Sequence, residues 1–216
     1  MRLRKVKHAQ AFLDSHPESV IKHPENLKGK WKQAFANDYP IHLEIGSGKG
    51  RFIIEMAKAN PTINFIAIEK FDSVIIRILE KLVVTPLENV LLIHFDAFNI
   101  DTIFSQGEIE TIYLNFSDPW PKSKKAKYRL TYPTFLEKYK IILNNNSKIC
   151  FKTDNFVFYE YSLMNFNKDE SFRIDKRSLD LDKEQISNVE TEFEIKFKRL
   201  GLPIYYIEVV NLRREL

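Results

Sequence analysis

A short apolar run at residues 41–45 leads into a glycine-rich turn, Gly46-Ser47-Gly48-Lys49-Gly50, and a helix-patterned stretch follows at 51–59. Short apolar runs then alternate with segments of helical periodicity along the rest of the chain. We expect strands at 41–45, 65–68, 90–95, 111–116, 148–152 and 204–210, and helices at 51–59, 73–84, 132–143, 155–165 and 191–200. This order predicts an α/β fold with a mostly parallel, doubly wound sheet.

The chain has 216 residues, and chains divide into separate cores only above roughly 250–300 residues. We therefore expect one domain at residues 39–216, preceded at 1–38 by a basic N-terminal arm. No apolar run approaches the ~20 residues of a membrane helix, and no secretory signal is recognisable. The single cysteine, Cys150, and five scattered histidines suggest neither a disulfide nor a metal site. These features favour a cytoplasmic protein without a bound metal.

The net charge is +4, and its distribution is uneven. The basic residues of the N-terminal arm are Arg2, Arg4, Lys5, Lys7, Lys22, Lys28, Lys30 and Lys32. A second cluster consists of Lys122, Lys124, Lys125, Lys127 and Arg129, with no acid among them. Lysine-rich clusters favour a polyanionic partner such as a nucleic acid, and the alternative is an ordinary solvated surface.

The glycine-rich turn carries its own clue to a ligand. Its glycines read GxGxG, whereas a dinucleotide-binding turn reads GxGxxG and places a pyrophosphate on the helix N-terminus. Glu44 comes two residues before Gly46, and its carboxylate would repel a pyrophosphate. S-adenosylmethionine carries an ammonium and a sulfonium and no phosphate, so the charge pattern favours it over NAD. The alternative is a glycine turn, at Gly46, Gly48 and Gly50, that binds nothing.

Two further acids follow the next two expected strands. Glu69 comes after the strand at 65–68, and Asp96 after the strand at 90–95. Ligands of such sheets bind at the carboxyl ends of the strands, where an acid can accept hydrogen bonds from ribose hydroxyls. We therefore expect Glu69 to bind the ribose and Asp96 the adenine amino group. Either acid alone would be interpreted as a solvent-exposed strand end.

The loop after the fourth strand reads Ser117-Asp118-Pro119-Trp120-Pro121. Two prolines make it stiff, and it places one acid beside one large aromatic side chain just before the second lysine cluster. Acid, aromatic plane and cations in series are suited to a nucleic-acid base and its phosphates. The alternative is a rigid structural loop with Trp120 in the core.

These motifs resemble those of the bacterial tRNA (guanine-N7-)-methyltransferases. The resemblance runs from about Pro40 onward, in the segments IHLEIGSGKGRF, LNFSDPWPK, RLTYPTFL, FKTDN and TEFEIKFKRLG followed by PIY. It implies a Rossmann-like class I methyltransferase with an antiparallel last strand at 204–210. It also implies transfer of a methyl group from S-adenosylmethionine to N7 of a guanine in the variable loop of tRNA. The sequence does not determine the oligomeric state, and a homodimer is one of the alternatives.

The resemblance also implies roles for individual residues. The residues implied for the cofactor are Glu44, Glu69, Asp96 and Asp118, of which Asp118 would also be catalytic. Those implied for the target nucleoside are Lys122, Asp154, Thr191 and Glu194. Those implied for the RNA are Lys124, Lys125, Lys127 and Arg129. The chain departs from the family at Tyr128, where arginine is frequent, and at Phe156-Val157, where Arg-Gly is common. Thr191 and Glu194 also match a helix capping box, a purely structural alternative.

The chemistry of guanine agrees with the residues present. N7 is an acceptor with a free lone pair, so it needs no deprotonation and the enzyme needs no histidine or cysteine nucleophile. Catalysis then depends on alignment and on stabilising charge, for which Asp118 is the candidate carboxylate. The competing interpretations are a methyltransferase acting on an adenine amino group, a non-catalytic RNA-binding protein, and an NAD-dependent oxidoreductase.

Overall fold

The computed structural model describes residues 8–212, and it consists of two compact units, one ending at Phe104 and the other starting at Ser105. Arg2, Arg4, Lys5 and Lys7 of the expected basic arm lie outside the described residues. No helix of the described part is long and apolar enough to cross a membrane.

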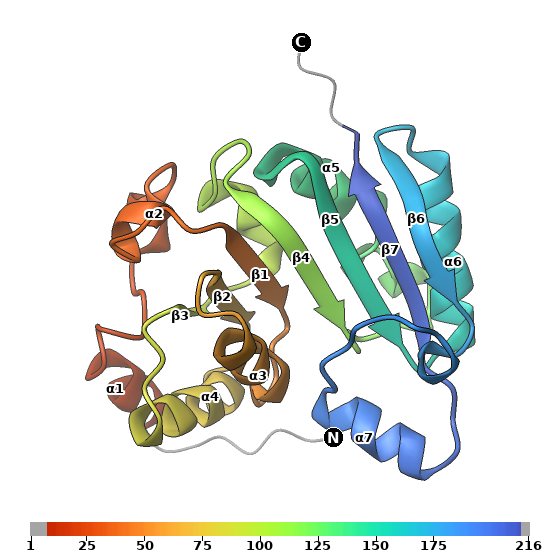
Figure 1. Cartoon of the computed structure of the whole chain (residues 1–216). Helices are drawn as coiled ribbons and strands as arrows, with labels where there is room; N and C mark the ends of the chain where they lie inside the picture. Colours follow the sequence, from red (N-terminus) through yellow and green to blue (C-terminus); the bar gives the residue numbers. More distant parts are fainter. Residues whose placement is uncertain (1–7, 213–216) are drawn as a thin grey trace. The chain divides into compact units, whose positions relative to one another are not determined.

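The first unit is built on three parallel strands in the order β3-β2-β1 (Figure 1). They are β1 (Ile41–Ile45), β2 (Asn64–Glu69) and β3 (Val90–His94), and nearly all their residues are buried. Such continuous burial is typical of parallel strands covered on both faces. Helices α3 (Arg51–Ala59) and α4 (Asp72–Val84) connect the strands and pack against β2 and β3. The short helix η2 (Ala97–Thr102) follows β3.

The described part of the expected arm is folded onto this unit. It contains α1 (Ala9–Asp14), η1 (Pro24–Leu27) and α2 (Trp31–Ala34), and α1 packs on α4. Val20 forms a parallel bridge to Leu92 of β3. Trp31 is fully buried, and its Nε1 donates to the carbonyl of Ile103 (2.8 Å). Apolar anchors between the lysines therefore make this segment part of the core, although the domain boundary at residue 38 stays a prediction.

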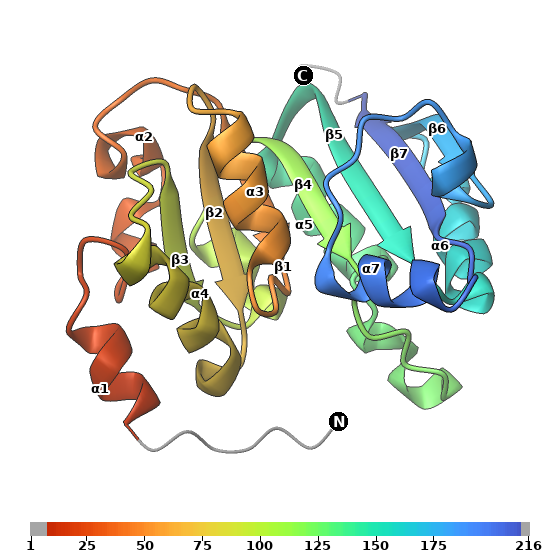
Figure 2. The same ribbon diagram turned by 60° about the horizontal axis from the view of Figure 1, so that its bottom comes forward.

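The second unit contains four strands in the order β4-β5-β7-β6. They are β4 (Ile109–Asn115), β5 (Leu143–Thr153), β6 (Phe172–Ser178) and β7 (Tyr205–Asn211). Strands β4 and β5 are parallel, and β7 is antiparallel to both of its neighbours, β5 and β6. The expected antiparallel last strand is thereby confirmed. Helices α5 (Pro133–Ile142) and α6 (Phe156–Lys168) pack against the strands (Figure 2).

All of the expected strands and helices are present, β1 and α3 with the expected ends and the others with shifted ends, but the sequence did not reveal β6. This strand lies at the edge of the sheet and exposes all four of its charged residues, Arg173 and Lys176 among them. Charged, half-exposed edge strands avoid pairing with other chains, and they show little of the apolar pattern by which strands are recognised. The remaining elements are η3 (Ser123–Tyr128), η4 (Leu181–Lys183) and α7 (Glu192–Arg199), which lies at the carboxyl end of β5 (Figures 1 and 2).

Candidate functional site

The glycine-rich turn of the first unit joins β1 to α3 and is held against β2. The N–H groups of Gly46 and Ser47 both donate to the carbonyl of Ile68 (2.8 and 3.1 Å). Gly46, Gly48 and Gly50 have positive φ angles of 77°, 56° and 77°, which side chains other than glycine adopt only with strain. A Cβ added to Gly46 or Gly48 would meet no atom within 4 Å, whereas one on Gly50 would collide with Ile78. The turn therefore keeps open space beside Gly46 and Gly48.

Glu69, at the end of β2, faces this turn. Its Oε2 accepts from the N–H of Gly48 (3.2 Å), and its Oε1 accepts from the N–H groups of Lys70 (2.9 Å) and Phe71 (3.1 Å). Burial raises the pKa of the Glu69 carboxyl above its ordinary value, and the three N–H donors offset part of that effect. Because a carboxylate has about four acceptor positions, Glu69 retains capacity for a further donor.

Asp96 follows β3 and belongs to the same edge of the unit. Its Oδ2 pairs with Lys70 Nζ (2.6 Å), and its Oδ1 accepts from the N–H of Phe98 (3.0 Å). Burial disfavours the charged form, but Lys70 and the Phe98 N–H outweigh it and keep the pKa of Asp96 below its ordinary value. Contacts therefore run from Gly48 to Glu69 and from Lys70 to Asp96.

Glu44 is buried on β1, next to the turn, and Ser47 Oγ donates to its carbonyl (3.1 Å). Since β1, β2 and β3 are parallel neighbours, Glu44, Glu69 and Asp96 lie at the same end of three adjacent strands. The three acids and the turn therefore lie along one edge of the first unit, and that they line one cofactor pocket stays a prediction. Their roles toward a cofactor are a separate matter.

The loop after β4 in the second unit has an unusual backbone. Phe116 and Trp120 both adopt positive φ angles, 51° and 41°, although neither is a glycine. Strained residues of this kind persist only where surrounding contacts enforce them, and they are frequent at functional sites. The Phe116 ring stacks on Phe193 and Phe197 of α7, at centroid distances of 6.1 and 5.9 Å. Asp118 lies between the two strained residues and is exposed to solvent.

Four of the five basic residues of the second cluster are exposed, on η3 and just before it: Lys122, Lys124, Lys125 and Lys127. We call these four the lysine cluster. Aromatic rings lie among them: Lys125 Nζ is 5.2 Å from the Trp120 ring, and Lys127 Nζ is 5.4 Å from the Tyr128 ring. Arg129 differs, because it is buried beneath the loop that carries Asp118. The structure thus separates Arg129 from the exposed lysines with which the sequence grouped it.

The remaining expected residues lie around the carboxyl end of β5. Thr191 and Glu194 do form the capping box of α7: Thr191 Oγ1 accepts from the Glu194 N–H (3.0 Å), and Glu194 Oε2 accepts from the Thr191 N–H (3.3 Å). Glu194 is fully buried, and both of its carboxylate oxygens accept hydrogen bonds. Asp154, by contrast, is exposed just after β5.

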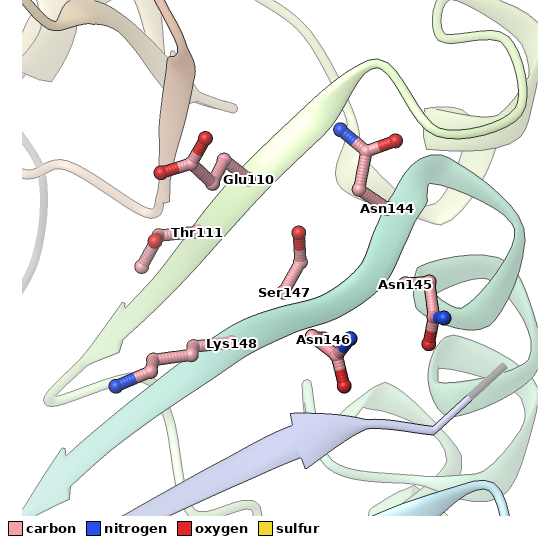
Figure 3. A pocket seen from close by; sticks show the side chains of 7 residues that line it. All are labelled: Glu110, Thr111, Asn144, Asn145, Asn146, Ser147 and Lys148. Carbon is pink, nitrogen blue, oxygen red and sulfur yellow. The ribbon is translucent and has the colours of Figure 1, made fainter.

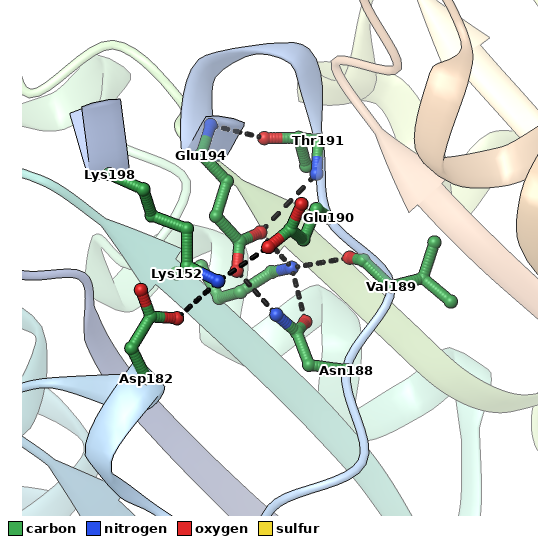
Figure 4. A network of polar contacts seen from close by, with 8 residues as sticks. All are labelled: Lys152, Asp182, Asn188, Val189, Glu190, Thr191, Glu194 and Lys198. Atoms are coloured by element: carbon green, nitrogen blue, oxygen red, sulfur yellow. Dashed lines mark hydrogen bonds and ion pairs between the residues drawn. The ribbon is translucent and has the colours of Figure 1, made fainter. Parts of the chain in front are cut away.

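Lys152 is a residue that the sequence analysis missed, and Figure 4 shows its contacts. Its Nζ is buried and donates to Glu194 Oε2 (2.9 Å), Asn188 Oδ1 (2.9 Å) and the carbonyl of Val189 (3.1 Å). Asn188 Nδ2 in turn donates to Glu194 Oε1. We call Lys152, Asn188, Val189, Thr191 and Glu194 the Lys152 network. The available signal was a lysine directly after the apolar run Ile149-Cys150-Phe151 of an expected strand, because a buried lysine requires a partner.

A cavity of about 450 Å³ opens elsewhere in the second unit (Figure 3). It is lined by Glu110, Thr111 and residues 144–148, from the first parts of β4 and β5. None of the expected site residues lines it. Ligands of parallel sheets bind at the opposite, carboxyl ends of the strands, so we do not assign the active site to this cavity.

Comparison with known proteins identifies the family. Residues 38–207 match the family model described as putative methyltransferase. The chain is 48% identical over 211 residues to the tRNA (guanine-N(7)-)-methyltransferase of Exiguobacterium sp., covering 97% of this chain and 98% of that protein. It is 49% identical over 210 residues to the protein of the same name from Geobacillus sp., covering 97% of this chain and 95% of the relative.

Solved structures agree on the fold. A variant of the 16S rRNA (adenine(1408)-N(1))-methyltransferase from Catenulisporales acidiphilia, with S-adenosylmethionine as cosubstrate, aligns with a TM-score of 0.58 at 13% identity. The alignment covers 87% of this chain and 92% of that protein. It supports the expected Rossmann-like class I methyltransferase fold. With relatives of such identity over nearly its whole length, the chain belongs to the tRNA (guanine-N(7)-)-methyltransferase family.

Proposed function

We propose that this chain is an enzyme that transfers a methyl group from S-adenosylmethionine to N7 of a guanine in tRNA, forming 7-methylguanosine. The observation that carries the proposal is the 48–49% identity over 97% of the chain to relatives named for this activity. We further propose that the guanine is in the variable loop and that the enzyme works in the cytoplasm. Sedimentation of the purified protein distinguishes a monomer from a homodimer.

The first unit has the features that a site for S-adenosylmethionine needs. Gly46 and Gly48 leave open space beside the turn, Glu69 can accept from ribose hydroxyls, and Asp96 can accept from an adenine amino group. Glu44 contributes a carboxylate beside the turn that would attract a cationic ligand. When bound, the cofactor supplies a methyl group on a positively charged sulfur. We propose that Glu44, Gly46, Gly48, Gly50, Glu69 and Asp96 bind it.

For the second unit we propose that Asp118 is the catalytic carboxylate and also contacts the cofactor. N7 of guanine attacks with its own lone pair, so no residue has to remove a proton beforehand. The methylated ring becomes positively charged, and a fixed carboxylate stabilises that charge. The strained backbone at Phe116 and Trp120 supports a fixed position for Asp118, because such conformations need enforcing contacts.

The target guanine would be bound by Lys122, Asp154, Thr191 and Glu194. Asp154 is exposed, and its carboxylate can accept from guanine N1–H or the amino group. Glu194 is fully buried and already accepts from Lys152, Asn188 and the Thr191 N–H, so we propose that it acts on the guanine site as a member of the Lys152 network. Lys124, Lys125 and Lys127 are exposed, and we propose that they contact tRNA phosphates.

The test is to incubate the purified protein with bulk tRNA and S-adenosylmethionine labelled in the methyl group, and then to identify the labelled nucleoside. We expect 7-methylguanosine alone. Labelled methyladenosine would instead support the adenine alternative, and tRNA binding without labelling would support a non-catalytic protein. Cleavage of the tRNA at 7-methylguanosine by borohydride and aniline then locates the base, and cleavage outside the variable loop would contradict that part of the proposal.

A further inference from the structure

Arg129 is a buried cation next to the Asp118 loop, which we define as residues 116–122. Only 8% of its surface is exposed, and its guanidinium forms no ion pair with a carboxylate among residues 8–212. Nε donates to the carbonyl of Pro119 (2.8 Å), and Nη2 donates to the carbonyl of Trp120 (3.1 Å). Arg129 therefore binds the backbone of the loop from beneath.

The two carbonyls are placed on either side of the strained residue. The φ angle of Trp120, 41°, is the torsion about its N–Cα bond. It fixes the position of the Trp120 carbonyl carbon relative to the Pro119 carbonyl carbon. A guanidinium offers its N–H groups in a rigid planar fork. Two donors of one fork can therefore hold both carbonyls in the relation that the left-handed turn requires. A lysine, with a single nitrogen, cannot reproduce this geometry.

The other side of the guanidinium is fixed by α6. Its central carbon lies 4.1 Å from the centroid of the Tyr161 ring and 5.9 Å from that of Phe158. A guanidinium over an aromatic face is attracted by the ring, and this contact replaces the missing carboxylate. Arg129 thus connects the loop to a helix of the rigid frame.

We propose that Arg129 is a positioning residue that holds the turn at Pro119 and Trp120, and through it the Asp118 carboxylate, and that it is not a phosphate ligand. The proposal rests on the proposed function, because Asp118 is the catalytic carboxylate there. Two of the five N–H donors of Arg129 are used inside the protein, and its burial limits access to the rest. The exposed lysine cluster has no such restriction.

The first test uses Arg129→Lys, which keeps the charge and removes the fork. We expect kcat at saturating tRNA and cofactor to fall by about 10- to 100-fold, the scale of a small misplacement of a reacting group. The affinity for tRNA and its salt dependence should stay within twofold of the wild type. The matched control is Arg173→Lys on the exposed edge strand β6, which should change neither quantity. Arg129→Gln removes the charge as well, and it should leave the salt slope of tRNA affinity unchanged. A slope flattened by about 0.7–0.9 in Arg129→Gln would show a phosphate contact and overturn the proposal.

The second test does not depend on activity, so it separates this inference from the proposed function. The protein has two tryptophans, and Trp31 is fully buried, so quenching of fluorescence by iodide reports mainly on Trp120. We expect Arg129→Lys to increase the quenching of Trp120. Unchanged quenching would overturn the proposal even if methylation of tRNA is observed.

A variant pair at Tyr161 covers the case in which Arg129→Lys does not fold. Tyr161→Leu removes the aromatic support of the guanidinium and leaves both carbonyl hydrogen bonds possible. Tyr161→Phe keeps the ring. We expect a smaller increase in Trp120 quenching for Tyr161→Leu and none for Tyr161→Phe. Equal quenching in these two variants would contradict the link from α6 through Arg129 to the loop.

Discussion

Glu69 in the first unit and Glu194 in the second are both buried acids near proposed binding positions, but they are held by different groups. Glu69 accepts from three backbone N–H groups, two of them within two residues of it. Glu194 is held by one backbone N–H and by the side chains of Lys152, 42 residues earlier, and Asn188. Backbone N–H donors are retained after almost any side-chain substitution, whereas a single substitution can remove the side-chain donors of the Lys152 network. The first unit should therefore tolerate changes around its acids better than the second.

The largest effect should follow from Lys152→Met. This change leaves the Glu194 carboxylate buried without its cation, and removal of one partner of a buried ion pair typically costs about 3–5 kcal/mol. Urea unfolding should show a loss of this size. The first unit offers the control, because Lys70 and Asp96 form an exposed ion pair and Lys70→Met should cost less than about 1 kcal/mol. Equal losses in the two variants would contradict the comparison.

A second variant distinguishes the unpaired charge from lost packing. Combining Lys152→Met with Glu194→Gln removes both charges, so the double variant should recover part of the stability lost by Lys152→Met alone. No recovery would mean that the Lys152 network contributes through shape and not through charge.

Asp118→Asn should give the next largest effect. The side chain is exposed, so the fold should be unaffected, and the substitution keeps size while removing charge. Loss of one preorganised electrostatic group lowers kcat by roughly 10²–10³, or about 2.7–4 kcal/mol. Turnover measured at saturating tRNA and cofactor checks this. Affinity for tRNA should change little because phosphates dominate it, and the control Asp175→Asn on β6 should behave like the wild type. Near-normal turnover of Asp118→Asn would leave catalysis to alignment alone.

The same difference between local and long-range contacts explains which parts of the site could be predicted from the sequence. Glu44, Glu69 and Asp96 could be placed together in advance, because parallel neighbouring strands bring their carboxyl ends to one edge. The sequence could not predict the burial of Arg129 or the pairing of Lys152 with Glu194, because both depend on contacts between residues far apart in sequence. Strand β6 was missed for a related reason. Its exposed charges are typical of an edge strand, and its position at the edge is known only from the folded sheet.

Cofactor binding by the first unit should respond more moderately. Glu69→Ala removes an acceptor for the ribose and leaves three backbone N–H groups around it unmatched, so affinity for S-adenosylmethionine should fall by roughly 1–3 kcal/mol. Calorimetric titration without tRNA measures it. Glu55→Ala, an exposed acid of α3 outside the site, is the control. Unchanged affinity for Glu69→Ala would remove Glu69 from the site.

The pH dependence of cofactor binding is a finer test of the same carboxylate. Burial raises the pKa of Glu69, so on acidification it takes up a proton at a higher pH than an ordinary glutamate. The protonated form accepts hydroxyl protons less well, and affinity should therefore decline as the pH falls through that raised pKa. Asp96, whose pKa is lowered, stays charged over that range. Glu69→Gln should bind more weakly and lose this pH dependence, and an unchanged profile would assign the titration to another group.

The smallest effect concerns one lysine on the surface of the second unit. Lys127 is exposed and near the Tyr128 ring, so Lys127→Ala should affect only its contact with tRNA. If that contact is a phosphate, the slope of log affinity against log salt should flatten by about 0.7–0.9. Lys58→Ala on α3, where the lysine pairs with Glu55, should leave the slope unchanged. An unchanged slope for Lys127→Ala would make this lysine part of a solvated face. A flattened slope for Lys127→Ala but not for Arg129→Gln, both of which remove one charge, would separate phosphate binding from loop positioning within one short segment.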